Sequence, residues 1–291
     1  MNGAQTGALA GFEAFKTIAQ VNVFSGITSF PLIILGVWRG GLQGALWGSV
    51  AALGINWALN NRALRRECAR ANVSYQFAGC HRELSILHRF SLPAFLASVV
   101  LGPAMWGCNA LLVRQPQGYA ELGIYMAADK WRLLILFVPT SVFAMVLPVL
   151  SNLYGEGDSA GFRKVFRANL HWNASLALLA TLVIAALAAP IMAMYGDAFR
   201  GGRFVLIVLA FSALAEAMNS ILGQPLIAAH LMWWRFAFDL LILSVLGTLA
   251  WVLIPKWGAL GLAVSYGLAY AATNLGLFLF LQARGLARFH K

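Results

Sequence analysis

Eight long apolar runs constrain the fold of this chain more than any other feature of its sequence. A transmembrane helix needs about 20 mostly apolar residues, and each run is that long. The chain is 60% hydrophobic and only 11% charged, whereas about 25% of residues are charged in soluble domains. The runs are Ala19–Trp38, Gly41–Asn60, Leu92–Val113, Trp131–Tyr154, His171–Tyr195, Arg203–Gly223, Arg235–Pro255 and Gly258–Gln282. The sequence therefore predicts an all-α, polytopic helical membrane protein with eight transmembrane helices and excludes an ordinary soluble enzyme.

The formal net charge of +11 has a topological explanation. Basic residues concentrate on the cytoplasmic side of membrane proteins. If the N-terminus is cytoplasmic, 14 of the 21 Lys and Arg residues fall in inner segments and the other 7 in outer segments. We therefore expect both termini in the cytoplasm. Because most of this charge lies between apolar runs, it does not indicate a nucleic-acid partner.

An internal repeat relates the second apolar run to the eighth. The segment RGGLQG at 39–44 aligns with KWGALG at 256–261, with an offset of about 217 residues. Gly41 then coincides with Gly258, and Gly44 with Gly261. Transporters are often built from such repeats. We expect two six-helix repeats, the first of which lacks its first four helices here.

The repeat and the charge pattern together predict four regions. Residues 1–60 are expected to be the remnant of an N-terminal lobe with two transmembrane helices, and residues 61–91 a basic cytoplasmic linker. Residues 92–283 form a C-terminal six-helix lobe, and 284–291 a cytoplasmic tail. Within the second lobe, Gly155–Leu170 is expected to be an amphipathic helix resting on anionic headgroups, or else a solvated connector.

The amino-acid sequences of several segments resemble those of the bacterial polysaccharide flippases. These O-antigen or oligosaccharide translocases belong to the multidrug/oligosaccharidyl-lipid/polysaccharide exporter superfamily. The similar segments are Leu9–Lys16, Trp106–Val113, Gly118–Gly123, Trp131-Arg132, Leu147-Pro148, Leu153–Asp158, Asn219–Gln224 and Met232–Trp234. They occur in the family's order along essentially the whole chain, which would correspond to helices five to twelve.

The resemblance implies a MATE/flippase-like inverted-V fold of two lobes, with an incomplete N-terminal lobe. It implies flipping of an undecaprenyl-pyrophosphate-linked oligosaccharide across the bacterial inner membrane by alternating access, with the chain as a fragment of the complete transporter. Expected partners are this lipid-linked sugar, membrane lipids, the missing N-terminal half and other polysaccharide-assembly proteins. Two alternatives stay open: a drug or cation antiporter of the same superfamily, and a non-functional membrane-inserted fragment.

Polar groups inside the sixth and seventh runs are candidates for an inner gate. A charge in hydrocarbon is costly, so intramembrane carboxylates such as Glu216 and Asp239 indicate function or a polar contact between helices. Asn219 follows Glu216 on one helix face, and Gln224 lies at its end. We interpret these four residues as an inner gate or ion-coupling group. The alternative is a structural polar cluster that joins the two helices.

Four residues at the outer side are candidates for the substrate cavity. Asn109, Arg114, Trp131 and Arg132 flank the third and fourth runs. Arginine binds pyrophosphate through paired hydrogen bonds, and an indole ring can stack on a sugar. The alternative is an interfacial belt of aromatic and basic side chains. An expected outer loop at 114–130 separates the third run from the fourth.

The sequence contains no pattern that predicts an enzyme, a cofactor site or a metal site. It lacks a nucleophile elbow, a P-loop and a zinc-protease motif. Cys68, Cys80, His81 and His88 share the expected linker, but their spacing forms no tight metal-binding pair. A membrane-embedded sugar polymerase is disfavoured because the expected outer loops are short.

Overall fold

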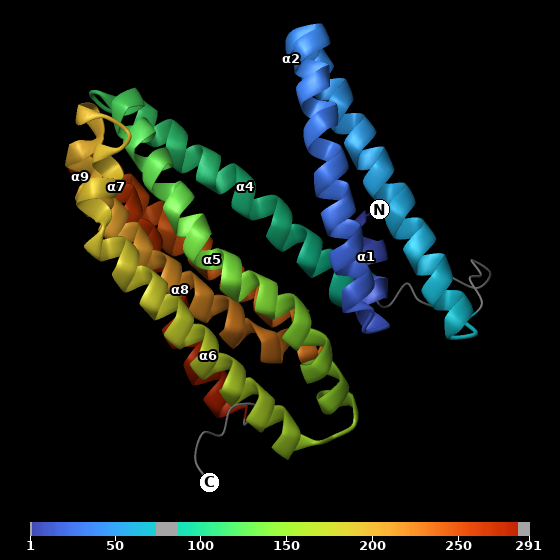
Figure 1. The fold of residues 1–291 in the computed structure, drawn as a ribbon. Helices are drawn as coiled ribbons and strands as arrows, with labels where there is room; N and C mark the ends of the chain where they lie inside the picture. The colour runs from blue at the N-terminus through green and yellow to red at the C-terminus, as the bar shows by residue number, and fades with distance from the viewer. Residues whose placement is uncertain (1, 74–86, 285–291) are drawn as a thin grey trace. The chain divides into compact units, whose positions relative to one another are not determined.

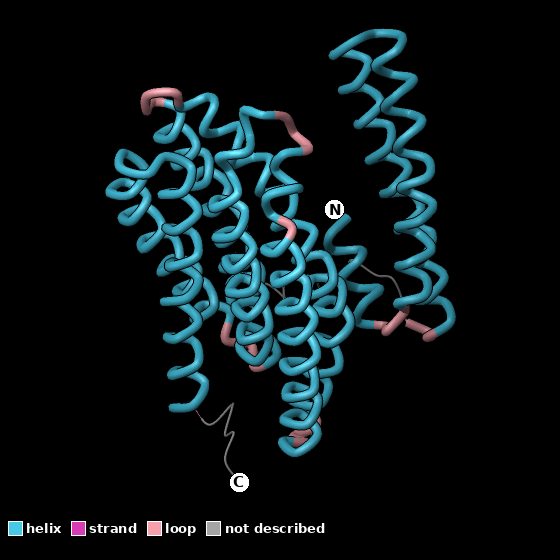
Figure 2. The backbone as a smooth tube through the Cα atoms, turned by 60° about the vertical axis from the view of Figure 1, so that its left-hand side comes forward, coloured by secondary structure: helices cyan, strands magenta, loops and turns pink. Residues whose placement is uncertain are grey.

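The computed structural model describes residues 2–73 and 87–284, and all their regular structure is helical (Figures 1 and 2). The chain divides into two compact units, Met1–Cys80 and His81–Lys291, which we describe separately. The first unit contains α1 (Asn2–Gly11) and α2 (Phe15–Arg70). The second contains η2 (Leu87–Ser91), α4 (Leu92–Val113), α5 (Gly118–Gly155), α6 (Ser159–Ala186), α7 (Ala188–Ala193), η3 (Asp197–Gly202), α8 (Arg203–Ala228) and α9 (Met232–Ala283).

Six of the described helices are long and apolar enough to cross a membrane. The eight predicted runs map onto them because α2 and α9 each contain two runs. A straight helix of their 56 and 52 residues would be about 80 Å long, far more than the roughly 30 Å of a bilayer core. Both are instead broken near the middle, at Gly40 and Gly41 in α2 and at Gly258 in α9.

Each broken helix folds back on itself as a hairpin. In α2, the Asn56 amide donates a 2.7 Å hydrogen bond to the Ser25 hydroxyl, 31 residues earlier. A Cβ atom added to Gly44 would lie 1.8 Å from the Gly36 carbonyl oxygen, so only glycine allows the two arms to cross this closely. Figure 1 shows the two arms of α2 side by side, joined at one end.

The backbone confirms the internal repeat that the sequence predicts. Gly41 has φ 53° and ψ −132°, and Gly258, 217 positions later, has φ 54° and ψ −128°. The turns before the two hairpins also correspond: Glu13 has φ 55°, and His230, at the same offset, has φ 58°. A positive φ is uncommon in residues other than glycine. Two copies of one helix–turn–hairpin motif are therefore present.

The close crossing recurs in the second copy and leads to a first prediction. A Cβ atom at Gly261 would lie 2.2 Å from the Leu253 carbonyl oxygen. Gly261→Ala should push the arms of α9 apart and lower the free energy of unfolding by about 1–3 kcal/mol. Gly247→Ala is the matched control, because no atom lies within 4 Å of its Cβ position. Detergent-to-SDS titration measures both, and equal effects would contradict the close crossing.

Helix α8 is the centre of the second unit (Figure 1). In its most apolar 18-residue stretch 56% of the residues are buried, against at most 28% in the other candidate spans. One apolar core joins α4, α5, α8 and α9 around fully buried residues such as Leu209, Ala213 and Leu262. A second core lies around Leu150, Phe166, Ile221, Leu277 and nearby side chains. A polar side chain on the buried face of α8 is consequently shielded from water.

The predicted amphipathic segment Gly155–Leu170 is not a separate helix resting on lipid. Its residues from Ser159 onward form the first turns of α6, capped by the Asp158 carboxylate, which accepts hydrogen bonds from the backbone N–H groups of Ala160 and Gly161. Phe162 and Phe166, which we expected to face lipid, are 5% and 1% exposed. Their rings fill the second core, so the apolar face packs against protein.

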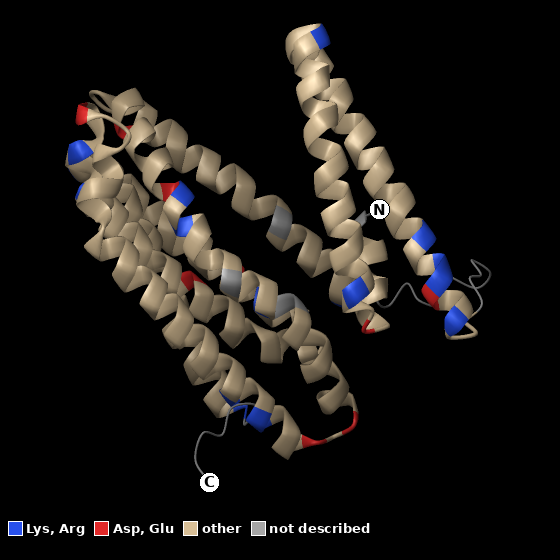
Figure 3. Ribbon diagram, in the orientation of Figure 1, with Lys and Arg blue, Asp and Glu red and all other residues tan. Residues whose placement is uncertain are grey.

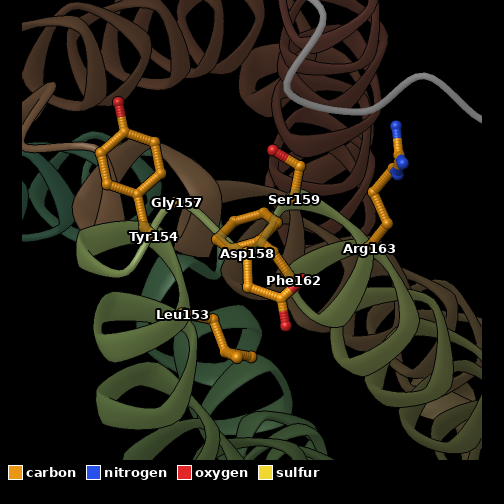
Figure 4. Close-up of a pocket in the computed structure, with 7 residues that line it drawn as sticks. All are labelled: Leu153, Tyr154, Gly157, Asp158, Ser159, Phe162 and Arg163. Carbon is orange, nitrogen blue, oxygen red and sulfur yellow. The ribbon is translucent and has the colours of Figure 1, made fainter.

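The turn between α5 and α6 surrounds a small cavity of about 230 Å³ (Figure 4). Tyr154, Asp158 and Arg163 are among its lining residues, and Figure 4 shows Tyr154 and Arg163 on opposite sides of it.

The predicted linker at 61–91 begins as helix, because α2 continues to Arg70. Its part at 74–86, with Cys80 and His81, and the tail beyond residue 284 lie outside the described residues.

Candidate functional site

A buried cluster of charged and phenolic side chains lies where α5, α8 and α9 meet. Arg132 of α5 is its centre. Its Nε donates to the Asp129 carboxylate at 2.6 Å, and its Nη1 donates to the Glu216 carboxylate and, at 2.9 Å, to the Tyr266 hydroxyl. The Tyr266 hydroxyl donates in turn to Glu216 at 3.1 Å. Three helices that are distant in sequence are thus joined by one arginine.

The rings of two tyrosines extend this cluster along α9. Tyr266 and Tyr270 are four residues apart, with their ring centroids 4.9 Å apart and their hydroxyl oxygens at 3.4 Å. The Arg132 guanidinium lies 4.8 Å from the Tyr266 ring centroid, within range of a cation–π interaction. The two carboxylates and one guanidinium leave the cluster with one excess acidic group.

Tyr125 adds an unpaired polar atom beside the charges. It is 1% exposed, and its hydroxyl is buried without a hydrogen-bond partner among the described residues. Tyr125, Asp129 and Arg132 follow at i, i+4 and i+7, which places them on one face of α5. A buried hydroxyl without a partner is costly, and Tyr125 thus retains an unused hydrogen-bond donor beside the charges.

The cluster unites residues that we predicted for two separate sites. Arg132 was assigned to an outer cavity and Glu216 to an inner gate, yet they form a direct ion pair. The reason is that α5 begins at Gly118 and not near Trp131, so the expected outer loop at 114–130 is wrong. Arg132 is 14 residues into α5 and Glu216 is 13 residues into α8, about 20 Å from each helix start.

The other predicted cavity residues do not join Arg132. The Trp131 Nε1 donates to the Tyr195 hydroxyl at 3.2 Å. Arg114 directly follows α4, immediately before the short turn that leads into α5. The Asn109 side-chain oxygen is buried without a hydrogen-bond partner among the described residues. The structure thus distributes the four predicted residues over at least two environments.

Two of the other gate candidates, Asn219 and Asp239, belong to a second polar group, which begins about one turn further along α8. Asn219 accepts hydrogen bonds from Arg235 through its side-chain oxygen at 2.8 Å and its carbonyl at 3.2 Å. Arg235 also pairs with Asp239 at 2.9 Å. A Cβ atom at Gly223 would lie 2.2 Å from the Arg235 guanidinium, so this glycine gives the arginine access to α8. The Asp239 carboxylate is therefore paired with an arginine of its own helix, α9.

Gln224 belongs to a ladder of amides between α6 and α8. Its Oε1 accepts from the Asn169 side chain at 2.8 Å, and Asn169 accepts from Asn173 at 2.6 Å. Asn169 and Asn173 continue the buried face of α6 that begins with Phe162 and Phe166. We did not predict these two asparagines as site residues from the sequence, nor Arg235, Tyr266 and Tyr270. The available signal was an i, i+4 spacing, which relates Asn169 to Asn173, Tyr266 to Tyr270 and Arg235 to Asp239.

The Arg235–Asp239 pair leads to a second prediction. Asp239→Asn removes a charged acceptor that is buried in the protein, so the free energy of unfolding should fall by about 1–2 kcal/mol. Asp197→Asn is the control, because Asp197 forms a similar ion pair with Arg200 on the surface and should contribute less than about 0.5 kcal/mol. Chemical unfolding in detergent compares the two variants. Equal losses would show that burial adds nothing to the Arg235–Asp239 pair.

The chain resembles known proteins in both sequence and fold, although no known family model matches it. It is 29% identical over 200 residues to the EPS I polysaccharide export inner membrane protein EpsE of Ralstonia nicotianae, and 29% identical over 198 residues to EpsE of Ralstonia solanacearum. The chain is a distant homologue of these export proteins. Each alignment covers 68% of this chain and 45% of the relative, so the chain spans about half the length of the curated relatives it matches.

Solved structures of MATE transporters share the fold. A point mutant of the Vibrio cholerae MATE transporter VcmN superimposes with a TM-score of 0.84 over 96% of this chain and 65% of VcmN, at 15% identity. An outward-facing multidrug resistance transporter of the MOP superfamily gives 0.74 over 90% of this chain and 61% of its own, at 12% identity. The predicted helical, MATE-like fold is confirmed, and the similar proteins are transporters rather than enzymes.

Proposed function

We propose that this chain moves a lipid-linked oligosaccharide across the bacterial inner membrane by alternating access, as part of a longer transporter. The distant homology to polysaccharide export proteins supports the substrate class. The undecaprenyl-pyrophosphate carrier follows from the resemblance of the motifs described above. The fold alone does not separate this function from drug or cation export, because solved multidrug transporters share it.

We propose eight membrane crossings, with both termini in the cytoplasm. The arms of α2 and of α9 would each cross the membrane twice, with Gly41 and Gly258 at the outer turns. Large apolar side chains on the helix surfaces support burial in lipid: Phe30, Trp106, Trp172 and Trp251 are each at least 70% exposed. Residues 1–60 would be two helices of an N-terminal lobe, and 92–283 the six-helix C-terminal lobe.

The single observation that carries the mechanism is the buried Arg132 cluster. One guanidinium faces two carboxylates, so a bound proton or monovalent cation would neutralise the group inside the membrane. Occupied and empty states would then differ in the contacts between α5, α8 and α9. Such a difference is what an ion needs in order to shift the balance between two conformations. We assign Glu216 the coupling role and Asp239 a structural one.

Deletion of the gene in its host tests the proposed function. We expect surface polysaccharide to be lost and lipid-linked oligosaccharide to accumulate, because the lipid carrier stays trapped on the inner leaflet. The wild-type gene should restore export, whereas Glu216→Gln should not. Asp197→Asn, which alters an exposed pair, is the control. Unchanged polysaccharide combined with new sensitivity to cationic dyes would favour the antiporter instead.

A further inference from the structure

The first unit contains a basic pocket between the arms of its helical hairpin. The pocket has a volume of about 480 Å³ and lies at the end of α2 that the distribution of basic residues assigns to the cytoplasm. Its lining includes Lys16, Arg62, Arg66 and Arg70, together with the polar side chains of Thr17 and Gln20. Figure 3 marks positions of Lys and Arg on the ribbon at this end of both arms. Glu67 is the acidic residue of the lining.

The charges in this pocket are unbalanced in favour of the cations. Glu67 pairs with Arg70 at 2.9 Å and accepts a hydrogen bond from Thr17 at 3.3 Å. Within the described residues 2–73, no salt bridge joins Lys16, Arg62 or Arg66 to a carboxylate. The arrangement therefore presents three cations around one cavity that form no salt bridge with a carboxylate of this described stretch, which is the chemistry that binds phosphate groups.

The wall of the pocket changes from polar to apolar with depth. Along the first arm, Lys16 is followed at helical spacing by Gln20 and Phe24, and along the second arm Arg62 is preceded by Leu59. Eight residues separate Lys16 from Phe24, a rise of about 12 Å toward the membrane centre. A ligand that fits has an anionic head and an apolar tail.

The second copy of the repeat has aromatic rings at positions that correspond to the lining of this pocket. At the offset of 217, Thr17 corresponds to Trp234 and Ala63 to Phe280. Those two rings pack 4.9 Å apart, and Phe238, at the position of Val21, contacts Phe280 at 5.6 Å. Aromatic rings thus fill in α9 the space that small and polar side chains leave open in α2.

We propose that this pocket binds the pyrophosphate head of an isoprenoid lipid, with the first isoprene units along Phe24 and Leu59. The inference rests on the proposed function and deepens it, because the pocket would hold the carrier lipid at the inner leaflet before translocation. Three cations around one cavity suit a pyrophosphate better than the single phosphate of an ordinary phospholipid, and the apolar wall suits a hydrocarbon chain.

Binding of radiolabelled farnesyl pyrophosphate to the purified chain in phosphatidylcholine nanodiscs tests the pocket. Arg62→Gln combined with Arg66→Gln should weaken binding at least about tenfold, because charge-assisted contacts are lost. Arg65→Gln removes one positive charge from the same helix at a position that does not line this pocket, and should change the affinity less than about twofold. Thr17→Trp combined with Ala63→Phe should abolish binding while every charge is kept.

Two results would overturn this proposal. If Arg65→Gln weakened binding as much as the pocket variants, general surface charge would explain the attraction. If phosphatidylglycerol competed as well as farnesyl monophosphate and farnesyl pyrophosphate, the site would not distinguish the carrier lipid. The assay measures binding without transport. Loss of the pocket with export intact therefore refutes this inference alone, whereas intact binding without any export role refutes only the proposed function.

Discussion

Replacing Arg132 with methionine should lower the free energy of unfolding of the second unit by about 3–5 kcal/mol, the cost of breaking a buried ion pair by removing one partner. Arg132 is 8% exposed and is the common partner of Asp129, Glu216 and Tyr266. Without it, two carboxylates are left close together in a largely dry interior. Unfolding in a detergent-to-SDS titration, followed by circular dichroism, gives the free-energy difference.

A double-mutant cycle identifies the source of this loss. Glu216→Gln in the Arg132→Met background should recover part of the stability, because one uncompensated carboxylate disappears with Glu216. The coupling between the two sites should lie within about 0.5–3 kcal/mol, as for residues in direct contact. Additive effects would contradict the ion pair, and a loss below about 1 kcal/mol for Arg132→Met would indicate a cluster open to water.

Replacing Gly258 with alanine should have the second largest effect. Gly258 has φ 54° and ψ −128°, a conformation that residues with a Cβ avoid and that costs about 1–3 kcal/mol. Its Cβ atom would also lie 2.7 Å from Oε2 of Glu121. That carboxylate caps the second arm of α9 by accepting the Ala259 N–H at 2.8 Å, and a lost cap adds about 1 kcal/mol.

Gly41→Ala is the matched control for this prediction. Gly41 has nearly the same backbone angles as Gly258, but no atom lies within 4 Å of its Cβ position. Its replacement should therefore cost the backbone strain alone. Gly258→Ala should destabilise by at least about 1 kcal/mol more, as measured by thermal unfolding in detergent. Adding Glu121→Gln to Gly258→Ala should recover little of the difference in stability between the two glycine variants. Identical costs of Gly41→Ala and Gly258→Ala would show that Glu121 does not act as a cap.

The membrane architecture could be predicted from sequence because it depends on local patterns. Apolar length identifies a spanning helix without knowledge of its neighbours. The glycine pattern at 41 and 258 marked the same backbone break in both copies, because few other residues adopt a positive φ. The repeat therefore emerged from six residues in each copy, and the structure adds the matching turns at Glu13 and His230.

The composition of the candidate site could not be predicted in the same way. Arg132 was placed at a membrane surface because the fourth apolar run begins only at Trp131, whereas the preceding turns of α5, from Gly118, carry Glu121 and Asp129. In the structure Glu121 caps α9 and Asp129 pairs with Arg132, so tertiary contacts compensate the polarity. The pairing of α5 with α8 is a non-local event that no spacing within one helix reports.

The most direct test of the account measures on which leaflet the lipid-linked oligosaccharide resides. Inside-out vesicles from the deletion strain, complemented with the wild-type chain, should move a fluorescent lipid-linked oligosaccharide from the outer vesicle surface into the lumen, where an added lectin cannot reach it. Vesicles with the Glu216→Gln variant should leave it accessible. Equal lectin access in vesicles with the wild-type chain and in those without it would contradict the proposed translocation.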